Sequence, residues 1–281
     1  MTISKNEITI VIPTRNEAPA IGQVIEEARQ EGYSNILVVD GHSTDGTFEY
    51  AKQSGANVIM QLGNGKCDAI KTAIRHVETP YMLVMSGGRT YDPKDIQTFL
   101  SHIENYDLII GFPDQARDIP RLNRFGSWVI AKIFNFLFRT RLHRVASGFY
   151  MLKTEHAKRL TLLSSNFGVD AEIAAETAFK GKLTDVRISY RNRIGEPKVP
   201  KLEGAAQIFR DIFGIYNMLS PFDPRVSVMG ALATAAIVVS SRILFGLEIT
   251  LAVTMLSIGA VFVSTWGLEF VARLLKLMLR S

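Results

Sequence analysis

The stretch that decides the fold is ILVVDGHSTDGT, residues Ile36 to Thr47. Its first part, Ile36 to Val39, is a short apolar run rich in β-branched residues. Such a run is typical of a central strand that is buried on both faces of a parallel sheet. Gly41 and Gly46 then allow the backbone to turn sharply, and the polar residues between them can cap a following helix. We therefore predict a strand, a tight turn and a helix from Thr47 to Ser54.

Two carboxylates lie in this turn, and we expect them to have different roles. In open α/β sheets, ligands bind beyond the carboxyl ends of the strands, where a carboxylate can bond the base or ribose of a nucleotide. Asp40 ends the apolar run, so we expect it to bind such a ligand. Asp45 stands next to the start of the helix, so we expect it only to shape the turn.

Further strands follow the same pattern along the chain. The apolar runs with the length and bounds of strands are Ile8 to Pro13, Asn57 to Leu62, Tyr81 to Met85 and Tyr106 to Gly111. Helical segments separate them, which predicts a doubly wound α/β fold with a mainly parallel sheet. Right-handed crossovers then place the loops after Pro13, Asp40, Gly63 and Ser86 on one rim of this sheet. A nucleotide-containing ligand is expected on that rim.

Two of the helices carry start signals of their own. Thr14 or Asn16 can cap the first helix, which has Pro19 in its first turn. Pro93 starts another helix, which we expect to reach His102, with Asp92 as its cap.

The segment GNGKCDAI, Gly63 to Ile70, leads into a helix expected from Cys67 to Val77. It lacks the spacing of a P-loop. A glycine turn with a lysine at a helix start still suits phosphate, through backbone N–H groups, the helix dipole and the ammonium. We favour phosphate binding by Lys66 over the alternative of a solvated lysine in a turn.

The composition narrows the classes of protein to consider. With 281 residues, 47% of them hydrophobic, the chain has room for one large domain and an appendage. The single cysteine, Cys67, excludes an intramolecular disulfide and fits a buried thiol better than a nucleophile. The five histidines show no metal-ligand spacing, which argues against a zinc site.

Two long apolar segments near the carboxyl terminus predict a membrane hairpin. They are Val226 to Leu247 and Ile249 to Leu268. At about 1.5 Å per residue, each can cross a hydrocarbon core of roughly 30 Å. The basic residues that flank the pair are Arg225, Arg273, Lys276 and Arg280. By the positive-inside rule, we expect a multi-pass membrane protein with both termini and the α/β domain on the cytoplasmic side. A soluble helical hairpin is the alternative.

Arg117 to Arg144 is rich in arginine and lysine, interleaved with aromatic residues. On a helix, Arg124, Ser127, Lys132, Asn135 and Arg139 would share one side, and the rest of the circumference would be apolar. This pattern suits a membrane interface better than nucleic acid. The segment from Gly204 to Leu219 repeats it, and a buried core helix is the alternative for both.

Short motifs along the chain, taken in their order and spacing, resemble those of one family. They are VIPTRNE (Val11 to Glu17), VVDGHSTDGT (Val38 to Thr47), GNGKCDAI (Gly63 to Ile70), LNRFG (Leu122 to Gly126), SGF (Ser147 to Phe149), DAE (Asp170 to Glu172) and RNRIGEPKVPKL (Arg191 to Leu202). Together with the hairpin, they resemble the family 2 glycosyltransferases of GT-A fold, of the polyprenyl-phosphate (dolichol-phosphate) mannose or glucose synthase type. The resemblance implies a GT-A domain at 1–203, a juxtamembrane helix and linker at 204–224, and the hairpin with its basic tail at 225–281.

The resemblance also assigns roles to residues. A UDP- or GDP-linked sugar would bind Pro13, Arg15, Glu17, Asp40, Gly41, Lys66, Ser86 and Gly88. The phosphate of a polyprenyl acceptor would face Arg121, Arg124, Arg193 and Lys198. The candidates for stabilising charge during sugar transfer are Arg89, Arg124, Arg193 and Lys198. The family further implies Mg²⁺ or Mn²⁺ as cofactor and a membrane as partner; it allows a homo-oligomer, and nucleic acid is not expected.

The chain departs from this family after the strand Tyr81 to Met85. Where active relatives carry an Asp-x-Asp pair, it has Ser86, Gly87 and Gly88, followed by Arg89. Without both carboxylates a hard cation loses its charged oxygen ligands, and Arg89 adds a repulsive charge beside the site. We therefore expect no metal at this position.

Two hypotheses follow from this departure. In the first, the chain is a membrane-bound glycosyltransferase that moves a sugar from a nucleotide-sugar to polyprenyl phosphate, with Arg89 or another cation in place of the metal. In the second, it is a catalytically silenced relative that binds a nucleotide, a lipid phosphate or a partner subunit. A processive polysaccharide synthase is disfavoured, because neither Trp128 nor Trp266 follows an arginine as in the Gln-x-x-Arg-Trp motif of such enzymes.

Overall fold

The computed structural model describes residues 3–113, 121–163, 168–195, 212, 214–216 and 218. The chain divides into two compact units, Met1–Tyr216 and Asn217–Ser281, and the elements named below belong to the first. The strands are β1 (Ile8–Thr14), β2 (Ile36–Asp40), β3 (Asn57–Met60), β4 (Tyr81–Met85), β5 (Leu108–Pro113), β6 (Phe149–Lys153) and β7 (Leu183–Ile188). The α-helices are α1 (Ala18–Gln30), α2 (Thr47–Gln53), α3 (Gly65–His76), α4 (Ile96–Leu100), α5 (Arg121–Phe138), α6 (Thr154–Ala157) and α7 (Val169–Lys180). Short 3₁₀ helices span Lys5–Glu7 and Pro93–Asp95.

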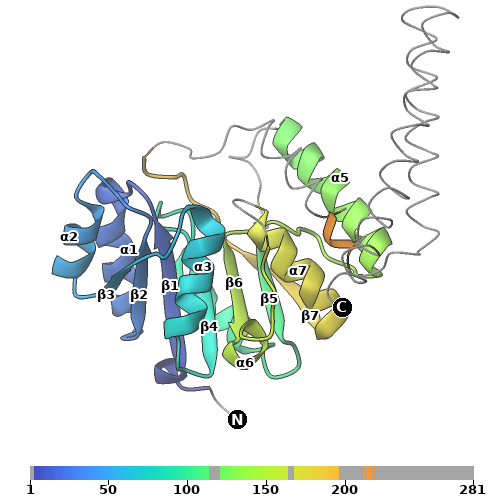
Figure 1. Ribbon diagram of the computed structural model, residues 1–281, viewed down its shortest axis with the longest axis horizontal. Helices are drawn as coiled ribbons and strands as arrows, with labels where there is room; N and C mark the ends of the chain where they lie inside the picture. Colours follow the sequence, from blue (N-terminus) through green and yellow to red (C-terminus); the bar gives the residue numbers. More distant parts are fainter. Residues whose placement is uncertain are drawn as a thin grey trace, which may run out of the picture. The chain divides into compact units, whose positions relative to one another are not determined.

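The strands form one sheet in the order β3-β2-β1-β4-β6-β5-β7 (Figure 1). β1 lies parallel to β2 and β4, β2 to β3, and β5 to β7. β6 runs antiparallel to its two neighbours, β4 and β5. The prediction of a mainly parallel, doubly wound sheet is therefore confirmed. Thr14 at the end of β1 pairs with Asp40 at the end of β2, so the two loops that follow leave the sheet side by side.

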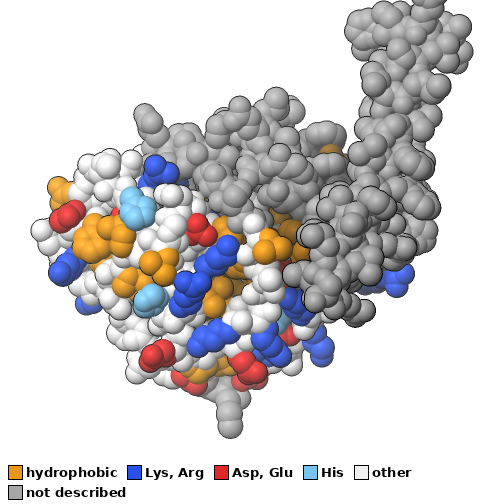
Figure 2. All heavy atoms as spheres, viewed as in Figure 1, with side chains coloured by type: hydrophobic (Ala, Val, Ile, Leu, Met, Phe, Trp, Pro, Cys, Tyr) orange, Lys and Arg blue, Asp and Glu red, His pale blue; other side chains and the backbone are white. Residues whose placement is uncertain are grey.

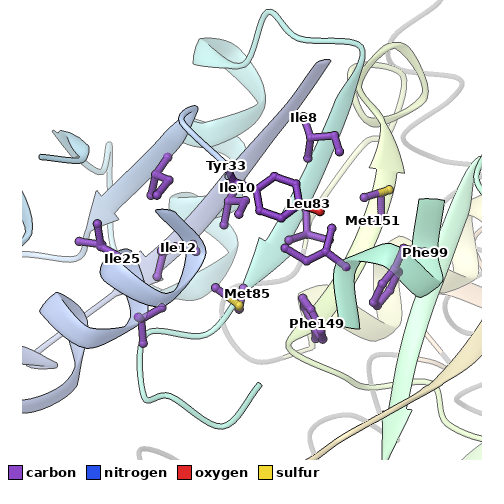
Figure 3. Packing of buried hydrophobic residues seen from close by; sticks show 14 of the residues in the cluster. Ile8, Ile10, Ile12, Ile25, Tyr33, Leu83, Met85, Phe99, Phe149 and Met151 are labelled. Atoms are coloured by element: carbon purple, nitrogen blue, oxygen red, sulfur yellow. The ribbon is translucent and has the colours of Figure 1, made fainter. Parts of the chain in front are cut away.

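One face of the sheet packs against α1 and α4. Ile8, Ile10 and Ile12 of β1 alternate toward this face, as the two-residue period of a strand requires. They join one buried cluster with Ile25 of α1 and Phe99 of α4, which Figure 3 shows in close view. This cluster fixes the carboxyl ends of the central strands, from which the rim loops start.

The opposite face is covered by α3 and α7, which lie in front of the sheet in Figure 1. The buried residues of α3 include Cys67 and Ile70, and those of α7 include Val169 and Ile173. Cys67 is a free and fully buried thiol, as predicted. Burial raises the pKa of Cys67 to about 11, so the side chain stays a neutral thiol and packs as a small apolar group.

The bounds of most elements agree closely with the sequence-based prediction, and the differences have local causes. β5 begins at Leu108 instead of Tyr106, and the carboxylate of Asp107, just before it, accepts from the backbone N–H of Lys182 at 2.9 Å. The helix expected from Pro93 to His102 starts as a 3₁₀ turn and continues as the short α4.

The amphipathic helix predicted between Arg117 and Arg144 is α5, and it has both a buried and an exposed side. Phe134 and Phe138 are buried, and Phe138 packs edge-on against Phe179 of α7 with ring centroids 5.6 Å apart. The exposed side carries Trp128 and Phe136, which are 55% and 50% exposed. The alternative of a core helix therefore describes the buried side of α5, and an interfacial role of the exposed side stays a prediction.

The hairpin expected in residues 225–281, Lys198, and most of the segment from Gly204 to Leu219 lie outside the described residues. Within the part of the chain that the structure describes, no helix is both long and apolar enough to cross a membrane.

Candidate active site

The loops after β1 and β2 are joined at the rim, as the sequence predicted. The backbone N–H of Gly41 donates to the carbonyl of Thr14 at 2.7 Å. Asn16 bonds the neighbouring loop twice, because its N–H donates to Ser43 Oγ at 2.9 Å and its Oδ1 accepts from the N–H of Thr44 at 2.9 Å. The loop after β3 joins them through His42, whose ring lies 3.2 Å from the carbonyl of Gly63.

Asp40 is fully buried and orders its own turn. Its Oδ2 accepts from the N–H of Ser43 at 2.8 Å, and its Oδ1 accepts from the Ser43 hydroxyl at 2.5 Å. The hydroxyl of Thr14 lies 3.4 Å from the same Oδ1. Asp40 therefore shapes the turn, a role that the sequence analysis assigned to Asp45. Contact between Asp40 and a nucleotide stays a prediction.

Asp45 shapes the turn as predicted, and it also caps a helix that is distant in sequence. It accepts from the N–H of Ala18 at 3.1 Å, while Thr47 Oγ1 accepts from the N–H of Glu17 at 2.8 Å. Although burial opposes the shift, hydrogen bonds from Thr47 and Ala18 lower the pKa of Asp45. The expectation that Thr14 or Asn16 caps α1 is therefore wrong, because the cap comes from the next loop and Asn16 is used to hold that loop.

Three residues at the rim have backbone conformations that are rare for side chains other than glycine. Asn16, His42 and Arg89 have φ angles of 54°, 61° and 59°. Such conformations cost about 1–3 kcal/mol each and persist only where the surrounding contacts impose them. Because such conformations cluster at ligand sites, their position on three loops of one rim supports this edge of the sheet as the candidate site.

The loop Ser86 to Asp92 stands where the sequence lacks its expected carboxylates, and a distant segment holds it. The N–H of Arg191 donates to the carbonyl of Thr90 at 2.9 Å, and the N–H of Ile194 donates to that of Gly88 at 3.0 Å. The Ser86 hydroxyl lies 2.8 Å from the Thr90 hydroxyl. Backbone hydrogen bonds thus hold the RNRIG motif, Arg191 to Gly195, beside this loop.

The arginines of the loop and of this motif form ion pairs with α1. Arg89 contacts Glu27 at 2.5 Å, and Arg191 contacts the other oxygen of Glu27 at 2.8 Å. Arg193 pairs with Glu17. Since both acids come from α1 or its cap, these pairs fix the loop and the motif relative to the β1 end of the rim.

Asp92 caps the 3₁₀ helix at Pro93, as predicted, by accepting from the N–H of Lys94 at 3.0 Å. Its other oxygen pairs with Arg191. Both oxygens of Asp92 are therefore used in the structure of the loop.

Lys66 lies at the start of α3, where the sequence placed it, and its ammonium binds Asp170 of α7 at 2.5 Å. Burial raises the pKa of Asp170, and Lys66 opposes this shift. The hydroxyl of Tyr150 is buried beside Asp170, and it too lowers the pKa of that carboxyl. A ligand phosphate at Lys66 would therefore share the ammonium with Asp170. Figure 2 shows lysine and arginine side chains in a band over α3, with acidic side chains gathered at the lower edge of that face.

The remaining predicted residues are placed as follows. Pro13 is half-buried at the end of β1, and Arg15 and Arg124 are exposed. Arg121 begins α5, with its side chain outside the described residues, as is the whole of Lys198.

Sequence reasoning missed Glu27, Thr47 and Asp170 as members of the site. Glu27 looks like a solvent-facing residue of an amphipathic helix, and its partner Arg191 lies 164 positions away in the chain. The motif DAE contained Asp170, but nothing in the sequence connected it to Lys66.

The side chains at the expected metal position do not fit a divalent cation. Ser86 offers a hydroxyl that is bonded to Thr90, and Gly88 offers no side chain. A Cβ added at Gly88 would lie 2.4 Å from Nη1 of Arg193, so a guanidinium fills this place. Hard cations prefer several carboxylate oxygens and are repelled by a guanidinium. Among the residues described, no three His, Cys, Asp or Glu side chains are grouped so that they could hold a metal.

Comparisons with known proteins agree with this geometry. A family model described as Glycosyl transferase family 2 matches residues 9–160. Glycosyltransferase AglJ of Haloferax volcanii is 39% identical over 192 residues, which cover 66% of this chain and 63% of AglJ. The chain thus spans somewhat less than two thirds of that relative. A dolichyl-phosphate hexose transferase of the same organism is 30% identical over 213 residues, covering 74% of this chain and 92% of that protein.

The fold also matches solved structures. Glucosyl-3-phosphoglycerate synthase from Mycobacterium tuberculosis, in complex with Mn²⁺, UDP-glucose and phosphoglyceric acid, superposes with a TM-score of 0.64 at 17% identity. The match covers 75% of this chain and 79% of that one, which confirms the predicted GT-A fold. The family model and the 30% identical relative show that the chain belongs to glycosyl transferase family 2.

Proposed function

We propose that the chain transfers a sugar from a nucleotide-sugar to a polyprenyl phosphate at the cytoplasmic surface of a membrane. The observation that carries the proposal is the cationic segment Arg191 to Arg193, which is held along the loop Ser86 to Asp92 by backbone hydrogen bonds. This places guanidinium groups beside the carboxyl ends of β1 and β4, where ligands of such sheets bind. The name of the dolichyl-phosphate hexose transferase relative supports the same class of acceptor.

The reaction needs little covalent help from the protein. An oxygen of the polyprenyl phosphate attacks the anomeric carbon, a new carbon–oxygen bond forms, and the bond to the diphosphate breaks. The nucleoside diphosphate leaves with the bonding electron pair. Because the attacking phosphate is already ionised, no general base is required, and the chain's task is to position both anions and to stabilise the leaving charge.

A second function has an observation in its favour. The arginines Arg89, Arg191 and Arg193 are each already paired with a carboxylate, and the expected metal ligands are missing. These features suit a silenced relative that keeps the nucleotide site for binding alone, as a membrane-bound partner subunit.

The experiment that separates these functions measures sugar transfer from UDP- and GDP-sugars to polyprenyl phosphate, with the full chain in membranes. We expect transfer from at least one donor in Mg²⁺, and equal transfer in EDTA. No transfer from any donor, with protein that still binds UDP or GDP, would exclude the enzyme and leave the binding subunit. The control is a chain with Lys182→Ala, which changes an exposed residue directly before β7. We expect it to show the same transfer as the unchanged chain when it is prepared in the same way.

We propose that α5 is the element of the domain that contacts the membrane surface. Trp128 and Phe136 are exposed on one side of the helix, with Lys132 placed 5.8 Å from the centre of the Trp128 ring. Exposed aromatic residues beside basic ones are typical of helices that lie in the headgroup region, where the rings enter the acyl boundary.

The proposed contact can be tested because the chain has only two tryptophans. In a Trp266→Phe chain in anionic vesicles, we expect the emission of Trp128 to be quenched by lipids that are brominated near the headgroup. The control carries Tyr50→Trp, Trp128→Phe and Trp266→Phe, because Tyr50 is exposed to a similar degree, 54%, on α2. Equal quenching of both chains would contradict a role of α5 in membrane contact.

A further inference from the structure

We propose that Arg193, seated on Gly88, takes the place of the divalent metal and stabilises the diphosphate of the bound nucleotide. The inference rests on the proposed nucleotide-sugar site and assigns one residue to the charge that a metal would supply there. Among the cations that the resemblance offered for this charge, Arg89, Arg124, Arg193 and Lys198, the inference selects Arg193.

The side chain of Arg193 can pack against residue 88 because glycine has no side chain. A Cβ built at Gly88 would lie 2.4 Å from Nη1, 2.7 Å from Cζ and 3.2 Å from Cγ of Arg193. These contacts span the side chain from its stem to the guanidinium, so the whole side chain lies against the Gly88 backbone. Any side chain at position 88 would move it.

The backbone fixes the same contact. The N–H of Ile194 donates to the carbonyl of Gly88 at 3.0 Å, directly after Arg193 in sequence. Glu17, which is 8% exposed, binds the guanidinium from the β1 side of the rim. A guanidinium has five N–H donors in a planar fork, enough to keep a carboxylate contact while it binds phosphate oxygens. Arg193 is therefore held in place before a ligand arrives.

Arg89 and Arg191 are used differently. Both bind Glu27, and Arg191 also binds Asp92, so their charges are shared with acids that brace the loop. Arg193 differs from them, because its side chain lies next to the position of a Gly88 Cβ and its acid partner is Glu17. This divides the cluster into two arginines that hold the loop and one that occupies the place of the missing carboxylate.

The charge at the site is the same as in a metal-dependent site. Two aspartates carry −2 and a divalent cation carries +2, so together they add no net formal charge. Ser86 and Gly88 without a metal also add none, and Arg193 with Glu17 adds none. Had the two carboxylates been kept and the cation lost, they would repel a diphosphate. Losing both carboxylates together therefore leaves a site in which a guanidinium can act on phosphate without a metal.

The test uses the full chain in nanodiscs and measures the binding of UDP and GDP by calorimetry, in EDTA and in Mg²⁺. We expect one nucleotide to bind equally in both conditions. Arg193→Ala is expected to weaken binding about 10- to 100-fold, as loss of a charged hydrogen-bonding partner does, and Arg193→Lys is expected to restore part of the loss. Arg75→Ala, which removes an exposed charge from the last turn of α3, is expected to bind as the unchanged chain does.

The packing of Arg193 against Gly88 is tested by a double-mutant cycle. Gly88→Ala alone should weaken binding to nearly the same extent as Arg193→Ala, and adding it to Arg193→Ala should cost little more. Gly22→Ala, in the middle of α1 with only the Ser54 hydroxyl at 3.3 Å, is the matched glycine control. Thermal unfolding of each variant verifies that it is folded. If Gly88→Ala is not folded, the comparison of Arg193→Ala with Arg193→Lys still tests the role of Arg193.

The outcomes distinguish this inference from the proposed function. Binding that requires Mg²⁺, additive effects of the two substitutions, or no binding of either nucleotide would each overturn the role of Arg193. EDTA-resistant binding with no sugar transfer would overturn the proposed enzyme and leave the role of Arg193 standing. Sugar transfer that EDTA abolishes would do the reverse.

Discussion

Replacing Phe149 by alanine is expected to lower the free energy of unfolding by about 3–5 kcal/mol, the usual cost of removing a buried aromatic side chain. Phe149 is fully buried at the start of β6. Its ring stacks on Tyr91 at 5.0 Å and meets Phe99 edge-on at 4.9 Å. Figure 3 shows Phe149 and Phe99 near each other, to the right of Met85. Urea unfolding followed by circular dichroism measures the change.

The same substitution should also weaken nucleotide binding, because Phe149 supports the rim. Tyr91 belongs to the loop Ser86 to Asp92, and its hydroxyl accepts from the N–H of Gly148 at 3.2 Å. Phe136→Ala removes the same side chain from a position that is 50% exposed, and we expect its effect to stay within about 0.5 kcal/mol. Similar losses in the two variants would show that burial against Tyr91 and Phe99 does not determine the contribution of Phe149.

The parts of the fold that follow from local pattern could be predicted. β4 has the bounds expected from sequence, because Tyr81 to Met85 is an apolar run between clear breaks. The parallel register of β1 and β2 follows from the alternation of strands and helices, and it places the loops of Thr14 and Asp40 together. The antiparallel β6 has no such local signal, because its direction depends on how the chain returns from α5.

The site residues that follow a strand could be predicted from the apolar runs, whereas Lys66 was expected from a glycine turn at a helix start and Arg193 from a resemblance. Asp40, Ser86 and Gly88 were found because they come directly after apolar runs. The ion pairs were not found, since Glu17 and Arg193 lie 176 positions apart in the chain and their contact depends on the tertiary fold. The sequence shows which residues are charged, but it does not show which of them form ion pairs with one another. For this reason the sequence left the replacement for the metal open between Arg89 and other cations, and the structure turns Arg89 toward Glu27.

Replacing Asp40 by alanine is expected to reduce kcat/KM for sugar transfer about 100-fold, of the order seen when a group that organises an active site is removed. The cause we expect is loss of the turn. The carboxylate accepts from the N–H and hydroxyl of Ser43 at 2.8 Å and 2.5 Å, and without it these half-buried donors lose their partner. An unsatisfied buried donor costs about 1–3 kcal/mol, so the melting temperature should fall as well. Transfer assays and thermal unfolding of the same samples measure both effects.

Ser43→Ala decides whether Asp40 acts through this turn or touches the nucleotide. Ser43 also accepts from the N–H of Asn16 at 2.9 Å, so its hydroxyl links the Asp40 turn to the loop after β1. If Asp40 positions the loops, Ser43→Ala should reproduce a large part of the loss, and the double variant should be far from additive. If Asp40 binds the base or ribose directly, Ser43→Ala should keep most of the activity, and the loss in Asp40→Ala should lie in nucleotide affinity. The buried position of Asp40 and the short contacts to Ser43 favour the first outcome, because a carboxylate with no exposed surface reaches a ligand only if its turn opens.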